Sequence, residues 1–170
     1  VDAQRERTII VIGERMNPRA DDALPWEELA QYDAVYLTGA DRAGIRAARM
    51  ARKLVATSRI VPVLREAAVE LDVLIGSASD PGEHYDGSLV PAPRTIVRTD
   101  GERGGSYQIG DDVHQYAAVP TKVSGDTYGA GDTFAAALTY ALAEGKLIGE
   151  ALDDAARRAV AVLAHTGPYS

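Results

Sequence analysis

Short apolar runs alternate with amphipathic stretches through the first half of the chain. Runs of apolar and often β-branched residues are typical of buried strands. The predicted strands lie at residues 8–12, 34–37, 60–64 and 73–75. Pro62 removes one backbone donor from the third of them, which places that strand at an edge or an end of a sheet.

Stretches with the helical spacing of apolar residues separate these predicted strands. A short helix begins at Pro25 and Trp26, because proline suits the first helical position. Asp41 is expected to cap a helix that runs to about Ala56, and residues 66–71 form another short helix. This alternation of strands and helices predicts a parallel sheet that is covered by helices on both faces.

The second half of the chain begins with strands and ends with helices. Residues 95–98, 107–109 and 114–119 are predicted strands, of which the last two are antiparallel. Helices are expected at residues 133–144, where Gly145 ends the helix, and at residues 147–163. The pattern as a whole predicts an α/β fold with a mostly parallel sheet, in a single domain that spans residues 1–170.

Length and composition fit a globular domain and narrow the range of partners. A chain of 170 residues buries roughly two-thirds of its unfolded surface on folding. The net charge of −7 argues against nucleic acid or an anionic membrane as the main partner. The absence of cysteine excludes disulfides and thiolate metal sites. No apolar run approaches the ~18 residues of a transmembrane helix, so a cytoplasmic protein is expected.

The segment DTYGAGDTF at residues 126–134 indicates a site for an anion. The first N–H groups of a helix have no partner within it, and the helix dipole places partial positive charge there. Side chains no larger than a methyl group at Gly129, Ala130 and Gly131 let a phosphate approach this backbone closely. Asp132 beside such an anion can accept the proton of an attacking hydroxyl. A plain helix cap is the alternative role for Asp132.

Five segments of the sequence resemble motifs of one enzyme family, in the same order. They are AVYLTG at 34–39, TDGERGG at 99–105, AAVPTKVSGDT at 117–127, DTYGAGDTFAAAL at 126–138 and HTGP at 165–168. The fourth is similar to the D-T-x-G-A-G-D signature of the PfkB/ribokinase family of carbohydrate and nucleoside kinases. This resemblance implies a ribokinase-like fold with three α/β/α layers. It also implies transfer of a phosphoryl group from ATP to a hydroxyl of a sugar or nucleoside, with Mg²⁺ as cofactor and K⁺ as a further candidate ion.

The same resemblance assigns roles to individual residues. Asp132 would act as the general base toward the substrate hydroxyl. Three residues would stabilise the charge on the transferred phosphoryl group through their backbone N–H groups: Gly129, Ala130 and Gly131. Three more would lie along the nucleotide: Thr99, Gly101 and Gly104. Asp126 would help to hold a monovalent cation, and an Asx-type turn is its alternative role.

The sequence departs from the family pattern at two places. The family's Asn-x-x-Glu motif, which organises Mg²⁺ and phosphate through water, would align with Gly76 and Ser79 and is missing. Asp80 or Glu83 can take its place through the waters of Mg²⁺, or the two belong to an ordinary solvated loop. The family's N-terminal segment is also missing, with most sugar-contacting residues and the lid through which a homodimer could form. The chain is therefore expected to be incomplete at its N-terminal side.

Two further functions are compatible with these observations. A catalytically idle relative would keep the fold as a nucleotide- or sugar-binding module. The missing Asn-x-x-Glu motif favours this alternative, and the intact residues 129–132 disfavour it. A structural fragment that completes a larger kinase chain is the other alternative, and the missing N-terminal segment favours it.

Overall fold

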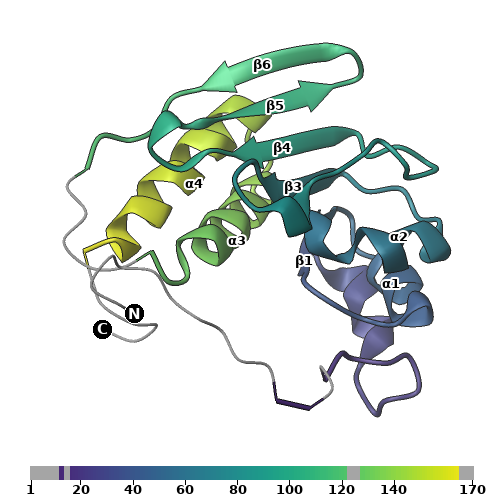
Figure 1. The fold of residues 1–170 in the computed structure, drawn as a ribbon. Coiled ribbons are helices and arrows are strands. Elements are labelled where there is room, and N and C mark those ends of the chain that lie inside the picture. The colour runs from purple at the N-terminus through teal and green to yellow at the C-terminus, as the bar shows by residue number, and fades with distance from the viewer. Residues whose placement is uncertain (1–11, 14–15, 122–126, 165–170) are drawn as a thin grey trace.

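The computed structural model describes residues 12–13, 16–121 and 127–164, which are organised around one six-stranded sheet (Figure 1). Helices α1 (Arg42–Ala48) and α2 (Val61–Ala67) lie on one side of this sheet. Helices α3 (Ala130–Ala143) and α4 (Ile148–Val162) lie on the other side. The three α/β/α layers expected from the sequence are therefore present. None of the helices in the described residues combines the length and the apolar composition needed to cross a membrane.

The strands follow one another across the sheet in the order of the sequence. They are β1 (Val35–Leu37), β2 (Leu54–Thr57), β3 (Val73–Ser77), β4 (Thr95–Thr99), β5 (Gly105–Ile109) and β6 (Asp112–Tyr116). The first four strands are parallel, and the last two are antiparallel to their neighbours, so the prediction of a mostly parallel sheet is confirmed. Because β1 to β4 run in the same direction, their carboxyl ends meet along one edge of the sheet.

Both faces of the parallel strands are buried. In β2, Leu54 and Ala56 belong to the core beneath α1 and α2, whereas Val55 between them belongs to the core beneath α3 and α4. All three are completely buried, as is Leu138 of α3. A strand buried on both faces needs apolar residues at every position, which explains the continuous apolar runs of the sequence.

The described residues also form four short 3₁₀ helices. They are η1 (Trp26–Gln31), η2 (Ser58–Ile60), η3 (Pro81–Glu83) and η4 (Gly101–Arg103). The last three follow the carboxyl ends of β2, β3 and β4 respectively. The loops that contain them therefore lie together at the carboxyl edge of the sheet.

The predicted helix from Asp41 to about Ala56 is wrong in its second half. Asp41 does cap the helix, accepting the N–H of Gly44 at 2.7 Å, but α1 ends at Ala48. The chain then turns, and residues 54–57 form β2 between β1 and β3. Alanines and arginines at helical spacing continue past the end of α1, so local pattern did not mark the boundary, whereas burial between two strands decides it.

The assignments at residues 60–64 and 66–71 are also wrong. Residues 61–67 form α2, with Pro62 within its first two positions, where the missing N–H of proline is not needed. The helix ends at Ala68, which adopts a left-handed conformation with φ 52°. The predicted strands at 34–37, 73–75, 95–98 and 107–109 and the two C-terminal helices are confirmed. The strand predicted at 114–119 begins at Asp112 and ends at Tyr116. The strand predicted at 8–12 lies outside the described residues except for Ile12.

Candidate functional site

The carboxyl edge of the parallel strands brings together most of the residues that the sequence analysis selected. In open α/β sheets this edge is the usual place for a ligand. The loop after β3 contains Asp80 and Glu83, the turn after β4 contains Gly101, and Thr99 is the last residue of β4 itself. Asp132 lies in the first turn of α3, and its charge acts on Tyr36 of β1.

The amino end of α3 leaves a small open backbone surface. Its N-cap is Gly129, with φ 77°, and apart from its two chain neighbours no described residue has an atom within 4 Å of the place where a Cβ would be. The first regular helical bond runs from the N–H of Thr133 to the carbonyl of Gly129 at 2.8 Å. The N–H of Ala130 makes a long bond of 3.4 Å to Thr127, and the N–H of Gly131 has no acceptor among the described residues. This backbone is therefore accessible to an anion.

Asp132 does not serve as the N-cap of this helix. It lies three residues after Gly129, in the first turn, and its side chain is exposed. Within the described part of the chain, no hydrogen-bond or ion-pair partner binds its carboxylate. In that position its negative charge interacts favourably with the dipole of α3 and stabilises the helix. Because the carboxylate is exposed and has no partner in the described part of the chain, it is also free to accept a proton from a ligand.

The half-buried Tyr36 of β1 shows that Asp132 shares its surroundings with the loops after β2 and β3. Burial raises the pKa of Tyr36 to about 12, and the negative charges of Asp132 and Glu83 add to this rise, while the positive charge of Arg59 opposes it. One phenol hydroxyl is therefore within electrostatic reach of all three charged groups. Its pKa also keeps it a neutral hydrogen-bond donor at physiological pH.

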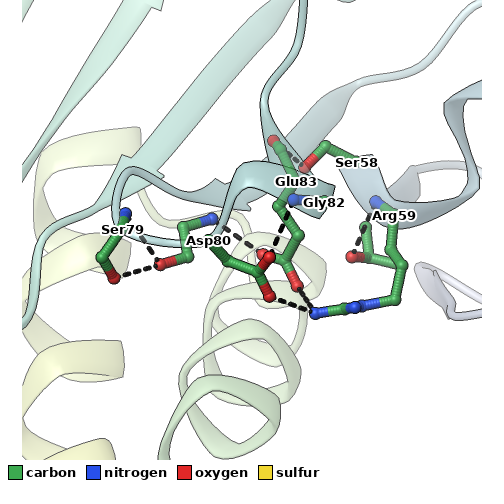
Figure 2. Close-up of polar contacts among 8 residues, drawn as sticks. Ser58, Arg59, Ser79, Asp80, Gly82 and Glu83 are labelled. Carbon is green, nitrogen blue, oxygen red and sulfur yellow. Dashed lines mark hydrogen bonds and ion pairs between the residues drawn. The ribbon is translucent and has the colours of Figure 1, made fainter.

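Asp80 and Glu83 are bound to Arg59, as Figure 2 shows. Nη2 of Arg59 lies 2.7 Å from Oδ2 of Asp80 and 2.6 Å from Oε1 of Glu83. The N–H of Gly82 donates to Asp80 at 2.8 Å, and this bond, together with Arg59, lowers the pKa of the Asp80 carboxyl. The hydrogen bonds to Asp80 and Glu83 in turn raise the pKa of Arg59. We call Arg59, Asp80 and Glu83 the Arg59 cluster.

With both carboxylates bound to Arg59, the Arg59 cluster does not form a metal site in this structure. Nowhere in the described ranges do three or more His, Asp or Glu side chains converge as metal ligands. The two carboxylates are also already partnered by a guanidinium. Their contact with Mg²⁺ through its retained waters stays a prediction.

The end of β4 and the turn after it contain the three predicted nucleotide residues in different settings. Thr99 is half-buried, Gly101 is exposed with φ 54°, and Gly104 is buried with φ 84°. A Cβ on Gly104 would lie 2.2 Å from the carbonyl oxygen of Tyr116, so packing of the hairpin alone explains this glycine. Thr99 and Gly101 remain accessible to a ligand. Asp126, the predicted cation ligand, lies outside the described residues.

Sequence reasoning missed Arg59 and Tyr36. Arg59 lies two residues after β2, so recognition of that strand would have placed it at the carboxyl edge. Tyr36 lies in a strand that was predicted, but nothing in the local pattern shows which polar groups surround its hydroxyl.

Comparisons with known proteins identify the family and the fold of this chain. The family model described as "pfkB family carbohydrate kinase" matches residues 68–170. A search of curated proteins finds no match. Among solved structures, ribokinase from Thermotoga maritima is similar in fold, with a TM-score of 0.70 and 18% identity, over 86% of this chain and 55% of that chain.

Two other solved structures are also similar to this chain in fold. A probable sugar kinase from Rhizobium etli has a TM-score of 0.66 and 16% identity, over 90% of this chain and 55% of that chain. Adenosine kinase from Schistosoma mansoni in complex with 2-fluoroadenosine has a TM-score of 0.68 and 17% identity, over 86% of this chain and 55% of that chain. The chain thus spans about half the length of the solved structures it resembles. Its fold is ribokinase-like, and the match of the family model over more than half of its residues shows that the chain belongs to the PfkB family of carbohydrate kinases.

Proposed function

We propose that this chain forms the nucleotide-binding and catalytic portion of an ATP-dependent kinase that phosphorylates a hydroxyl of a sugar or nucleoside. Family membership supports a kinase. The similar structures include a ribokinase and an adenosine kinase with a bound nucleoside analogue, which supports a small acceptor that carries a ribose-like ring. The observation that carries the proposal is the exposed Asp132, which has no hydrogen-bond or ion-pair partner among the described residues and follows the open backbone of Gly129 and Gly131.

In the proposed reaction the chain supplies positioning and charge rather than covalent chemistry. Asp132 accepts the proton of the acceptor hydroxyl as its oxygen attacks the γ-phosphorus of ATP, and ADP leaves with the bonding electrons. The backbone N–H groups at Gly129, Ala130 and Gly131 stabilise the negative charge on the transferred group, a contribution on the order of 3–4 kcal/mol per donor in other enzymes.

The proposal also assigns residues to the ions and to the nucleotide. Mg²⁺, when bound, neutralises phosphate charge, and Asp80 and Glu83 would reach it through water. Thr99 and Gly101 would contact the nucleotide at the carboxyl edge, and Gly104 would shape the turn behind them. Asp126 stays the predicted residue for K⁺, and the cytoplasm stays the predicted location.

An assay of ADP release tests the proposal. The purified chain, and the longest polypeptide that its gene encodes, are incubated with Mg·ATP and a panel of sugars and nucleosides. Because ordered positioning of the acceptor contributes ~7–11 kcal/mol to such reactions, we expect Mg·ATP binding by both but rapid transfer only where acceptor contacts are complete. Binding of ATP without transfer to any acceptor by either polypeptide would instead indicate an idle binding relative.

A binding comparison separates the phosphate site from the rest of the nucleotide site. The proposal expects ATP to bind more tightly than adenosine to the chain, since the open backbone of α3 recognises phosphate. Equal affinity for ATP and adenosine would mean that the backbone at the start of α3 does not recognise phosphate.

A further inference from the structure

The Arg59 cluster holds two carboxylates around one nitrogen atom. Nη2 of Arg59 lies within 2.7 Å of an oxygen of Asp80 and within 2.6 Å of an oxygen of Glu83 (Figure 2). Two carboxylates that bind the same nitrogen lie close enough for a divalent cation to bridge them in its absence. The guanidinium therefore occupies the place that such a cation would take.

Glu83 is fixed more firmly than a solvated loop carboxylate. While Oε1 binds Arg59, Oε2 accepts the backbone N–H of Ser77 at 2.8 Å. The hydroxyl of Ser58 donates to the Glu83 carbonyl at 2.7 Å. A Cβ at Gly76 would lie 2.2 Å from the Ser58 hydroxyl and 2.7 Å from the Glu83 carbonyl, so glycine at this position lets the loop pack against the end of β3. The Glu83 side chain is only 18% exposed as a result.

The position of the cluster relates it to the proposed nucleotide site. Ser77, which holds Glu83, is paired with Thr99 in the sheet, and the N–H of Ala78 donates to the Thr99 carbonyl at 2.8 Å. The charges of Asp132, Glu83 and Arg59 all act on the Tyr36 hydroxyl. The carboxylates of Asp80, Glu83 and Asp132 thus lie at this edge, in a region where a triphosphate would bring further negative charge.

We propose that Arg59 is a positioning residue that fixes Glu83 on Ser77 and keeps the Asp80–Glu83 pair from binding a free divalent cation. The nucleotide part of this inference rests on the proposed function, whereas the ion-pair part does not. With Arg59 in place, the pair carries one negative charge rather than two, which reduces repulsion of ATP at this edge. Without Arg59, the two carboxylates would bind a divalent cation by themselves and would repel ATP when that cation is scarce.

Binding of Mn²⁺ without nucleotide, measured by electron paramagnetic resonance, tests the ion-pair part directly. We expect Arg59→Gln to bind Mn²⁺ at least about fivefold more tightly than the wild-type chain, because two carboxylates lose their shared partner. Arg59→Lys keeps the charge and should bind Mn²⁺ as weakly as wild type. The double variant Arg59→Gln with Glu83→Gln should bind Mn²⁺ no more tightly than the wild-type chain, since only the Asp80 carboxylate remains.

Arg52→Gln is the matched control. Arg52 forms an ion pair with Asp33 at 3.0 Å, with side chains 66% and 61% exposed, and it precedes β2 at the opposite edge of the sheet. Its replacement should leave Mn²⁺ binding unchanged. If Arg59→Gln fails to unfold cooperatively, Arg59→Met provides the same loss of charge with an apolar side chain.

Calorimetry with Mg·ATP tests the nucleotide part. At low free Mg²⁺ we expect Arg59→Gln to bind ATP about fivefold more weakly than wild type, and excess Mg²⁺ should restore the affinity because the cation replaces the lost positive charge. A merely structural role for Arg59 would not be rescued by Mg²⁺ or by lysine. Equal Mn²⁺ affinity in wild type and Arg59→Gln would overturn the inference. A wild-type chain that binds no Mg·ATP would count against the proposed function instead, because the Mn²⁺ result stands without nucleotide.

Discussion

Replacement of Asp72 should destabilise the fold strongly, although it lies far from the proposed site. Asp72 precedes β3 at the amino edge of the sheet, and its side chain is 12% exposed. Its Oδ2 accepts the N–H of Leu54 at 2.8 Å and the Nη1 of Arg49 at 2.7 Å. Leu54 is completely buried, so its N–H has no access to water if the carboxylate is removed.

The expected loss of stability follows from these two contacts of Asp72. A buried N–H left without a partner costs about 1–3 kcal/mol. Arg49 would lose its carboxylate partner but keep bonds to the carbonyls of Glu70, Ala51 and Arg52, and with 26% of its side chain exposed it would regain some water. Together we expect Asp72→Ala to lower the free energy of unfolding by about 2–4 kcal/mol. Asp72→Asn keeps an acceptor for Leu54 and should cost about 1–2 kcal/mol.

Urea unfolding followed by circular dichroism measures these differences. With a typical dependence of stability on urea, Asp72→Ala should lower the midpoint by about 1–2 M. Asp33→Ala, which removes the partner of Arg52 in an exposed ion pair, should change nothing measurable. If Asp72→Ala unfolds at the same urea concentration as Asp33→Ala, the link between β2 and β3 through Asp72 contributes nothing, and the reasoning is refuted.

Three further predictions concern glycines and the half-buried Tyr36. Gly104→Ala should destabilise the chain by about 2 kcal/mol or more in urea unfolding, since its Cβ would meet the Tyr116 carbonyl at 2.2 Å, whereas Gly110→Ala, with open space around it, should cost about 1 kcal/mol. Gly129→Val should cost about 1–2 kcal/mol, because its φ of 77° opposes a branched side chain, and calorimetry should show weaker Mg·ATP binding as well. Stability should fall between about pH 10 and pH 12, since the unfolded chain loses the Tyr36 proton first, and thermal unfolding of Tyr36→Phe should show a shallower fall over that range.

The backbone arrangement of residues 129–132 could be predicted from sequence because its information is local. Gly129, Ala130, Gly131 and Asp132 are consecutive, and small residues before an acid at the start of a helical run indicate the same arrangement that the structure shows. The confirmed strands were equally local, since β1, β3 and β4 are short apolar runs bounded by polar turns. A feature that is determined within one turn of helix or one strand can therefore be predicted from the sequence pattern.

The Arg59 cluster could not be predicted in the same way. Its members come from the loops after β2 and β3, and their meeting depends on the register of two strands. The register was hidden because β2 was assigned to a helix, which placed Arg59 in an unstructured turn. Asp80 and Glu83 were selected as candidate residues for Mg²⁺, but their guanidinium partner is separated from them by more than twenty residues.

The most direct test of the proposed mechanism compares turnover and nucleotide affinity in Asp132→Asn. The acceptor is the sugar or nucleoside that the ADP-release panel identifies, and Asp153→Asn, an exposed aspartate of α4, is the control. We predict that Asp132→Asn lowers kcat by about 10² or more, because the base is lost, while the Kd of Mg·ATP measured by calorimetry changes by no more than a few-fold. A variant that keeps most of the wild-type turnover would contradict the account and leave Asp132 with only its interaction with the α3 dipole.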